Sequence, residues 1–288
     1  MPSDTSETRW PAPAKINRFL HILGRRADGY HALQTLFQFL DRCDTVHIRP
    51  RDDGEIRRGG ELADVPPEAD LTLRAAHALQ QDTGTAAGAE IRVHKRLPAG
   101  GGLGGGSSDA ATTLVALNHL WGCGLDVDAL ASLGLTLGAD VPVFVRGSAA
   151  WAEGVGERLQ PVTLDRPWYV VLVPACHVST AEVFRAPELT RNTPPITIAD
   201  LPDGGGNDFE SVVRARYPAV AGAFAALAPF GQARLTGSGG CVFLACATAD
   251  AARQAWRSCR AAGWDGFVAQ GLNRSPLAAC DGFPTTGV

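Results

Sequence analysis

The chain has 288 residues, which is enough to bury a substantial core in one large domain or two modest ones. Hydrophobic residues make up 45% of the sequence and charged residues 19%, as in ordinary soluble globular proteins, and no run of about 18 apolar residues predicts a transmembrane helix. The formal net charge of −4 argues against broad nucleic-acid binding, which needs a basic face, but leaves room for a compact phosphate site built from backbone amides.

Seven cysteines are scattered through apolar stretches, and no two of them form a C-x-x-C pair. An odd count without such pairs disfavours both a disulfide framework and a zinc ribbon. The first ten residues also lack the basic and then apolar pattern of a signal peptide. We therefore expect a cytoplasmic protein whose cysteines are reduced and packed as small hydrophobes.

The first half of the chain opens with sequence typical of strands. Residues 14–23 and 31–40 are rich in Leu, Phe and Ile, with a polar turn at 24–30 between them, and residues 45–49 predict a third strand. Residues 52–67 are polar and contain Gly and Pro, which predicts a loop. The elements expected after this loop are a helix capped by Asp70 with its apolar face on Leu71, Ala75, Ala76 and Leu79, a strand at 90–94, helices at 107–120 and 126–137, and a strand at 148–153.

The second half follows a stretch of turn and charge signals at 154–167, where we place a domain boundary that gives domains of residues 1–160 and 161–288. Strands and helices are mixed without a regular βαβ alternation, so the sequence predicts an α+β fold. We expect the tail from residue 275 onward to be loosely held. The elements expected in this half are strands at 168–173, 232–236, 241–246 and 266–270 and helices near 179–185, 208–216 and 250–262.

The strongest single feature is a glycine-rich segment that runs from Pro98 to Asp109 and is followed at once by a helical pattern. Six of the seven residues at 100–106 are glycine, which is a heavy entropic cost for a simple connector. Without side chains the backbone N–H groups can approach an anion closely, and the following helix adds its unpaired amides and the positive end of its dipole. Ser107 and Ser108 can add hydroxyl groups to phosphate oxygens or to a bound Mg²⁺. We interpret the segment as a phosphate-binding loop.

Two other interpretations of the loop fit less well. No Lys-Ser/Thr pair closes the segment, so it is not a Walker A loop. It does contain G-x-G-x-x-G at Gly100, Gly102 and Gly105, with Asp126 about as far onward as a dinucleotide-binding fold requires. Almost any glycine run of this length satisfies that pattern, and Asp126 precedes a helix instead of ending a strand. A dinucleotide oxidoreductase is therefore kept only as a minority alternative.

Two charged residues in apolar surroundings are candidates for phosphoryl transfer, which needs a group to take the proton of the acceptor hydroxyl. Asp140 lies between Gly138 and an apolar run, and it is either a general base or an ordinary turn residue. Lys15 stands at the head of an apolar strand, and it is either an exposed edge lysine or a buried cation that orients Asp140 and the acceptor hydroxyl. The residues alone leave both pairs of alternatives open.

Three blocks of this sequence resemble the GHMP kinases, the superfamily of galactokinase, homoserine kinase, mevalonate kinase and phosphomevalonate kinase. They are Pro13-Ala-Lys-Ile-Asn17, the Gly-Leu-Gly-Gly-Gly-Ser-Ser segment and Leu235-Thr-Gly-Ser-Gly-Gly-Cys-Val-Phe243, in the order that the superfamily has them. Further stretches, which are most similar to the members that act on diphosphocytidyl methylerythritol, lie at 15–31, 33–37, 138–142 and 206–210. Together the matches span residues 13 to 243, which is most of the chain.

The resemblance implies a two-domain α+β fold with the active site in a cleft between the domains. It also implies a kinase that uses ATP and Mg²⁺ to phosphorylate a hydroxyl of diphosphocytidyl methylerythritol, a small-molecule substrate, in the non-mevalonate route to isopentenyl diphosphate. It assigns Asp140 as the catalytic base and Lys15 as its partner. The residues that it implies as the cradle of the ATP phosphates are Pro98, Ala99, Gly100, Gly101, Gly102, Leu103, Gly104, Gly105, Gly106, Ser107 and Ser108.

The same resemblance places the acceptor against a second set of residues. These are Asn17, Tyr30, His31 and Phe184. His31 can offer directed hydrogen bonds to a cytosine edge, and Phe184 either stacks on the base or is an ordinary aromatic residue of a helix. Lys95, just before the loop, is either near the nucleotide or a solvated lysine. Asp109 stands where the superfamily often has Asn, and its negative charge is awkward beside an anion unless it faces Mg²⁺.

Two further functions are compatible with the same loop. One is a GHMP kinase with another small alcohol as acceptor, such as mevalonate or homoserine, but the Asp28-Gly-Tyr-His31 turn favours a cytidine-bearing substrate. The other is a kinase-like sensor that binds ATP without turnover, and the presence of both Lys15 and Asp140 argues against it. We expect no nucleic-acid or membrane partner, and either a monomer or a weak homodimer.

Overall fold

A mixed sheet flanked by helices is the framework of the computed structural model, which describes residues 6–60, 65–198 and 206–284. Its strands are β1 (Thr8–Arg25), β2 (His31–Arg51), β3 (Ile56–Arg58), β4 (Gly88–His94), β5 (Ala150–Gly154), β6 (Arg158–Pro161), β7 (Trp168–Leu172), β8 (Arg234–Leu235), β9 (Val242–Cys246) and β10 (Gly266–Leu272). Its α-helices are α1 (Leu71–Thr83), α2 (Gly105–Leu120), α3 (Val127–Leu135), α4 (Val141–Arg146), α5 (Thr180–Arg185), α6 (Glu210–Arg216), α7 (Pro218–Leu227) and α8 (Ala249–Ala261). Short 3₁₀ helices are η1 (Pro67–Ala69), η3 (Ala228–Phe230) and η4 (Pro276–Ala279).

The strands form one continuous sheet in which distant parts of the chain are neighbours. Seven strands follow the order β3-β4-β2-β10-β7-β9-β8, while β1 and β5 pair with β2 and β6 pairs with β5. Among these described strands the pairs are antiparallel, except that β3 runs parallel to β4. β10, near the end of the chain, pairs with β2, so the sheet connects the two halves of the sequence.

The prediction of separate strands at 31–40 and 45–49 is wrong, because residues 31–51 form the single strand β2. The register passes from Pro13 opposite Cys43 to Lys15 opposite Phe39, so β2 takes four steps where β1 takes two. This irregularity lies next to residues 41–44, which separate the two predicted strands. One of them, Asp44, is fully buried and accepts the backbone N–H groups of residues 96 and 97.

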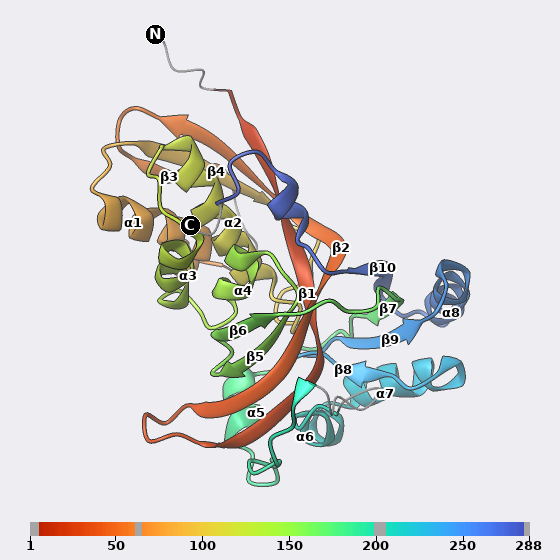
Figure 1. Cartoon of the computed structure of the whole chain (residues 1–288). Coiled ribbons are helices and arrows are strands. Elements are labelled where there is room, and N and C mark those ends of the chain that lie inside the picture. The colour runs from red at the N-terminus through yellow and green to blue at the C-terminus, as the bar shows by residue number, and fades with distance from the viewer. Residues whose placement is uncertain (1–5, 61–64, 199–205, 285–288) are drawn as a thin grey trace.

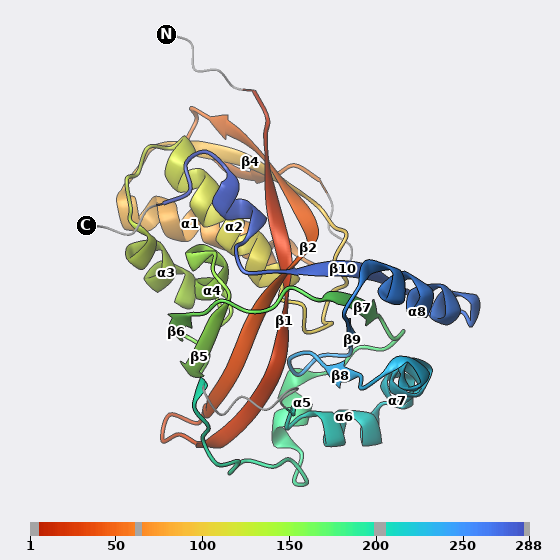
Figure 2. The same ribbon diagram turned by 45° about the vertical axis from the view of Figure 1, so that its right-hand side comes forward.

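The long β1–β2 hairpin is shared between the two main hydrophobic cores. The first core gathers α1 to α4 against Trp10, Phe37 and Phe39 of the hairpin. The second gathers α5 to α8 against Leu20 and Ile22 of β1. Figures 1 and 2 show the hairpin passing between the two helical groups, with α1 to α4 on one side and α6 to α8 on the other. The predicted α+β mixture is confirmed.

Two helices differ from the sequence prediction. The apolar run after Asp140 is rich in valine, which is typical of strands, yet it forms α4 with Pro142 in the first turn. Five of the six residues of α4 are buried, and four of these belong to the first core, so packing overrides the strand preference. The helix α7 also begins with a proline, Pro218, and was not expected between the two predicted elements at 208–216 and 232–236.

The prediction of a loosely held tail is wrong for the described residues 275–284. Ser275 accepts the N–H of Leu277 at 3.1 Å and caps η4, and Leu277 is fully buried in the first core. The backbone N–H of Ser275 donates to the carbonyl of Gly147 at 2.9 Å, which ties the segment to the end of α4. None of the helices in the described part of the chain is both long and apolar enough to span a membrane.

Candidate active site

The glycine-rich segment forms a curled loop that leads directly into α2. Gly100, Gly102 and Gly104 have φ angles of +67°, +78° and +73°, a left-handed conformation that side chains other than glycine rarely adopt. Gly104 is the N-cap of α2, so the free amides of the first helical turn follow the loop at once. Residues 97–107 line a cavity of about 930 Å³, here named the loop cavity. Curled backbone and a helix start at one cavity wall are the features that bind phosphate groups.

A second glycine-rich turn packs directly on the back of this loop. A Cβ on Gly102 would overlap the carbonyl oxygen of Thr236, and one on Gly239 would overlap the amide nitrogen of Gly102. The backbone N–H of Cys241 donates to the carbonyl of Gly101 at 3.1 Å. The third block of the sequence pattern, residues 235–243, therefore supports the shape of the loop.

Lys15 and Asp140 meet beside the loop. The Lys15 Nζ lies 3.2 Å from the Asp140 Oδ2, and the two side chains are 3% and 34% exposed. The ammonium also donates to the Oδ1 of Asn17 at 2.7 Å and to the carbonyl of Gly102 at 3.1 Å. Of the two alternatives left open for Lys15, the structure has the buried cation.

Asp140 is held at this position by the start of α4. It is the residue before the first turn of that helix, and its side chain makes no capping hydrogen bond there. The carboxylate is thus free for Lys15 on one side and for solvent or a ligand on the other. An ordinary turn aspartate would use its oxygens on nearby backbone N–H groups.

Asn17 links Lys15 to the floor of the site. It accepts from Lys15 through Oδ1 and donates through Nδ2 to the hydroxyl of Thr35 at 2.8 Å. Its backbone N–H donates to the hydroxyl of Thr236, which in turn donates to the carbonyl of Gly102. This buried network joins β1, β2 and both glycine-rich turns, so it fixes the position of the ammonium.

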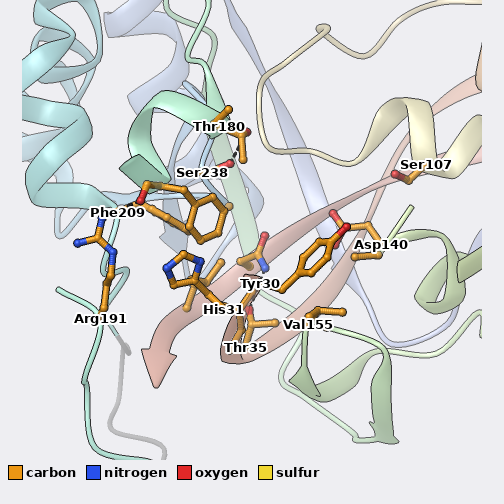
Figure 3. Close-up of a pocket in the computed structure, with 18 of the residues that line it drawn as sticks. Tyr30, His31, Thr35, Ser107, Asp140, Val155, Thr180, Arg191, Phe209 and Ser238 are labelled. Carbon is orange, nitrogen blue, oxygen red and sulfur yellow. Dashed lines mark hydrogen bonds between the residues drawn. The ribbon is translucent and has the colours of Figure 1, made fainter. Parts of the chain in front are cut away.

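A second cavity, of about 1280 Å³, opens on the other side of Lys15 and Asp140. We name it the aromatic cavity, because Tyr30, His31, Phe184 and Phe209 line it. The ring of His31 stacks on that of Phe184 with centroids 4.7 Å apart, and Phe184 meets Phe209 edge-on at 4.8 Å. Tyr30 is 67% exposed at its mouth. Figure 3 shows His31 and Phe209 on one side of this cavity and Asp140 with Ser107 on the other.

The two cavities share a wall, and the ion pair lies in it. The residues that line both are Lys15, Ser107, Asp140, Thr180, Gly237 and Ser238. A molecule in the loop cavity and a molecule in the aromatic cavity would therefore meet at the Asp140 carboxylate. A group that accepts a proton between two bound reactants is what phosphoryl transfer to a hydroxyl requires.

The two serines that follow the loop have different positions. Ser107 lines both cavities. Two other residues that line both, Thr180 and Ser238, share a hydrogen bond between their hydroxyl groups at 2.7 Å. Ser108 is fully buried in the first turn of α2 and is absent from both linings. Its hydroxyl has no hydrogen-bond partner among the described residues. Within the predicted stretch from 98 to 108, the structure brings all residues except Ser108 to the cavity wall.

A buried ionic cluster lies behind the loop. Lys95 donates to the carboxylates of Asp44 and Asp109, the latter at 2.7 Å, and it lines the loop cavity. Burial by itself would lower the pKa of Lys95, but Asp109 and Asp44 outweigh that effect and raise it. Of the two alternatives for Lys95, the structure has the one at the cavity, with two ionic partners instead of full solvation.

Asp109 is the buried member of that cluster whose pKa is raised. Burial raises its pKa to about 7, and the like charge of Asp44 acts in the same direction while Lys95 opposes both. Its Oδ2 is used by Lys95, and its Oδ1 is buried without a hydrogen-bond partner in the described part of the chain. This carboxylate is therefore paired with Lys95, and both residues line the loop cavity.

Several residues of the site had no clear signal in the sequence. Phe209 lies in a recognised block, Gly206-Asn-Asp-Phe-Glu210, but nothing marks it as part of a cavity. Asp44 lies between the strands predicted at 31–40 and 45–49, and its role depends on the irregular register of β2. Arg191 follows α5 in a segment without periodicity, although it lines the aromatic cavity.

Comparison with known proteins identifies the family. Residues 70–148 match the GHMP kinases N terminal domain, and residues 194–263 match the GHMP kinases C terminal model. A 4-diphosphocytidyl-2-C-methyl-D-erythritol kinase of Halorhodospira halophila is 60% identical over 272 residues, which cover 93% of this chain and 94% of that protein. The chain belongs to the 4-diphosphocytidyl-2-C-methyl-D-erythritol kinase family. A family member from Nitrosococcus oceani is 57% identical over 274 residues, covering 94% of this chain and 97% of its own.

Solved structures agree with membership of the 4-diphosphocytidyl-2-C-methyl-D-erythritol kinase family. A crystal structure of 4-(cytidine 5'-diphospho)-2C-methyl-D-erythritol kinase matches with a TM-score of 0.80 at 33% identity, covering 92% of this chain and 99% of that one. A homoserine kinase from Cytophaga hutchinsonii matches with a TM-score of 0.65 at 18% identity, covering 96% and 97%, and shares the fold alone. The predicted GHMP kinase fold with its N- and C-terminal domains is confirmed. The boundary at 160 and 161 stays a prediction. Membership of this kinase family implies that the chain uses ATP.

Proposed function

We propose that this chain transfers the γ-phosphoryl group of ATP to a hydroxyl of 4-diphosphocytidyl-2-C-methyl-D-erythritol. The observation that carries the proposal is the Lys15–Asp140 pair, 3.2 Å apart, in the wall shared by the loop cavity and the aromatic cavity. The relatives that are 57–60% identical carry this enzyme name, and they match nearly the whole chain. A cytoplasmic location and a monomeric or weakly dimeric state remain predictions from the sequence.

The loop cavity is suited to the triphosphate. The backbone amides of the glycine loop and the first turn of α2 offer hydrogen-bond donors, and the helix dipole favours negative charge at the same place. Residues 98–107 would cradle the phosphates, with the Ser107 hydroxyl at the junction with the second cavity. The buried Ser108 would support the helix start without touching the nucleotide.

Mg²⁺ fits this arrangement as a companion of the nucleotide. No group of three or more His, Cys, Asp or Glu side chains that could hold a metal occurs among the described residues. Mg²⁺ in kinases takes most of its ligands from phosphates and water, with one or two protein oxygens. Ser107 and the one-third exposed carboxylate of Asp140 offer oxygens of that kind at the junction. When bound there, the ion would supply neutralisation of phosphate charge.

Asp140 acts as the general base in this proposal. The acceptor hydroxyl oxygen bonds to the γ-phosphorus, the bond from that phosphorus to the β–γ bridging oxygen breaks, and ADP leaves with the bond's electrons. The hydroxyl proton passes to the Asp140 carboxylate. Lys15 orients that carboxylate through the 3.2 Å contact and places a positive charge next to the transferred group.

The aromatic cavity is suited to the acceptor's cytosine. Burial lowers the pKa of His31, and the positive charges of Arg191 and Arg25 lower it further, so the ring is neutral near pH 7. A neutral imidazole has one donor and one acceptor nitrogen, which matches the mixed edge of cytosine. The buried Nε2 of His31 has no hydrogen-bond partner among the described residues, an unmet polar group that a hydrogen bond from a ligand would satisfy. Tyr30 and Phe184 would contribute aromatic faces, with Phe184 already engaged by His31.

The experiment that tests the proposal is an acceptor panel with purified protein and labelled ATP. We expect phosphate transfer to 4-diphosphocytidyl-2-C-methyl-D-erythritol, with turnover on mevalonate and homoserine lower by orders of magnitude. Preferential turnover of either of the other alcohols would replace the proposed acceptor. ATP binding without turnover on any of the three would indicate a sensor, and the kinase proposal would be abandoned.

A further inference from the structure

Arg191 closes the end of the short helix that carries Phe184. Its guanidinium donates to the carbonyls of Phe184 and Ala186, each at 2.7 Å, and to that of Leu189 at 3.1 Å. The helix α5 has six residues, too few to be stable without outside contacts. Pro187 follows α5 and offers no N–H to its last turn, while the N–H of Leu189 also donates to the carbonyl of Ala186, at 3.2 Å. One planar cation therefore satisfies several carbonyls at the end of α5 and in the turn that follows.

The same residue also lines the aromatic cavity near His31. Figure 3 shows Arg191, His31 and Phe209 on the same side of that cavity. The ring of His31 stacks on the face of Phe184, and Arg191 is close enough for its charge to lower the pKa of His31. The position of the Phe184 ring, and with it the stack, depends on where α5 ends.

The charges that face His31 are mostly positive. The cavity that contains the ring is lined by charged groups from β1, α5, the segment before α4 and the segment after α5. These are Lys15, Arg25, Asp140, Arg185 and Arg191. The two that act on the imidazole, after burial itself, are Arg191 and then Arg25, and both lower its pKa. Asp28, two residues before Tyr30 on the turn, is paired with Arg26 at 2.9 Å.

We propose that Arg191 is a positioning residue of the acceptor subsite, which holds α5 so that Phe184 stays stacked on His31 and which places a fixed positive charge beside that ring. This inference rests on the proposed function, since it concerns recognition of the acceptor's base. Arg191 thus acts on the acceptor through two other side chains, and it has no part in the transfer of the phosphoryl group. Its geometric and electrostatic effects are separable, because lysine keeps the charge but loses the planar fork.

The test compares Arg191→Lys and Arg191→Gln with the wild-type enzyme. We expect both variants to raise the KM for the acceptor about tenfold or more, because charge-assisted hydrogen bonds to the helix end are lost. The KM for ATP should change less than twofold, since the loop cavity does not contain Arg191. Arg253→Gln, which removes an exposed arginine of α8 that pairs with Asp250, is the matched control and should leave both values unchanged.

The pH dependence separates charge from geometry. Removing the positive charge in Arg191→Gln raises the pKa of His31, so the acidic limb of kcat/KM for the acceptor should move to higher pH. Arg191→Lys keeps the charge, so its limb should stay close to that of the wild type despite the raised KM. The His31 titration, followed by NMR in the ligand-free protein, should show the same order without reference to activity.

Each outcome decides one question. A wild-type enzyme that is inactive on the acceptor would remove the proposed function, whereas active variants with an unchanged acceptor KM would remove the role of Arg191 alone. If the KM for ATP rose as much as that for the acceptor, the effect would be a distortion of the whole site and the positioning role would be rejected. The same holds if the His31 titration were identical in Arg191→Gln and the wild type.

Discussion

Lys15 is buried, yet each of its three ammonium hydrogens has a partner. Asp140, the Asn17 amide oxygen and the Gly102 carbonyl lie at 3.2, 2.7 and 3.1 Å. A buried cation with this set of partners has little freedom to move, and it holds the Asp140 carboxylate in place. The catalytic proposal therefore depends on a side chain whose position is set by β1 and by the glycine loop.

The Asp140→Asn variant should separate chemistry from binding. The amide cannot accept the hydroxyl proton, so we expect kcat to fall by about 10²- to 10⁴-fold, the usual contribution of a general base. Lys15 keeps its contacts with Asn17 and Gly102, and the loop cavity should keep its shape, so the Kd for ATP should change little. Steady-state kinetics and calorimetric titration with ATP measure the two effects.

Asp128→Asn is the matched control for that variant. Asp128 is 68% exposed on α3 and pairs with Arg146 at the surface, so its loss should leave kcat unchanged. Normal turnover in Asp140→Asn would remove the residue from the role of base. A large loss of ATP affinity in the same variant would instead assign it to nucleotide or metal binding.

The raised pKa of Asp109 predicts a specific pH dependence of stability. The folded pKa of about 7 lies above the ordinary value of 3.8, so between these limits the folded state holds a proton that the unfolded state has lost. Stability from this group is therefore present at low pH and is lost as pH rises toward 7, at up to about 1.4 kcal/mol per pH unit. Asp109→Asn removes the titration, and the variant should gain stability relative to the wild type as pH rises from about 4 to 7.

Denaturant unfolding of both proteins across this pH range measures the difference. Asn can still accept from Lys95, which keeps Asp44 as its ionic partner, so the fold should be retained. Asp250→Asn, at a 94% exposed position on α8, should give a pH-independent difference from the wild type. A constant gap between Asp109→Asn and the wild type from pH 4 to 8 would contradict the raised pKa.

At the residue scale, the sequence identified residues of unusual chemical type but did not reveal which residues contact them. Lys15 and Asp140 could be selected because charged residues in apolar runs are unusual, and Gly100 to Gly106 because so many glycines are costly. Asp44 could not be found, because its position under the loop follows from an irregular strand register. Arg191 could not be found either, since its hydrogen bonds are all to carbonyl groups that no sequence pattern reports.

At the scale of elements, the loop is stable because two glycine turns are in backbone contact. Neither turn has room for a methyl group where they touch, at Gly102 and at Gly239. The sequence predicted each glycine block and the helix after the first, since helical spacing resumes at Ser107. It did not predict that the blocks pack on each other, because contact between segments over 130 residues apart leaves no local signal. α4 was missed for a related reason, as burial in the core overrides its valine-rich preference.

Gly102→Ala tests this contact against a glycine of matched conformation. Gly102 and Gly122 have φ angles of +78° and +65°, so alanine is strained at both, by about 1–2 kcal/mol. Only at Gly102 does the new methyl overlap a neighbour, the carbonyl of Thr236, while nothing lies within 4 Å at Gly122. We expect Gly102→Ala to lose about 1–3 kcal/mol more than Gly122→Ala and also to raise the KM for ATP.

Denaturant unfolding and the KM for ATP are the two measurements for this pair. Gly122→Ala should be less stable than the wild type but should bind ATP normally, because Gly122 lines neither cavity. Equal effects of the two variants on ATP binding would show that the turn of residues 235–243 does not shape the loop.

At the scale of the whole molecule, the hairpin joins parts that the sequence separates. β1 and β2 supply residues to both main cores, and β10 returns to pair with β2 at Leu40 and Phe39. The sequence predicted the α+β class from the mixture of periodicities, but the strand order depends on pairings between residues over 200 positions apart. Such pairings follow from the tertiary fold and from the register of β2, so local patterns could not reveal them.

The Leu277→Ala variant tests whether the C-terminal segment is part of the first core. Leu277 is fully buried there although it belongs to the last elements of the chain, so alanine should leave a cavity and cost about 2–5 kcal/mol. Leu135→Ala on α3, at a 40% exposed position, should change the free energy of unfolding by less than about 0.5 kcal/mol. Because the hairpin is common to both cores, the variant should unfold in one transition that is shifted as a whole, by tryptophan fluorescence and by circular dichroism alike. Two separate transitions would show that the cores are independent. The Lys15 ammonium hydrogen bonds from the hairpin to the glycine loop, so it would then lack the common framework that holds it against Asp140.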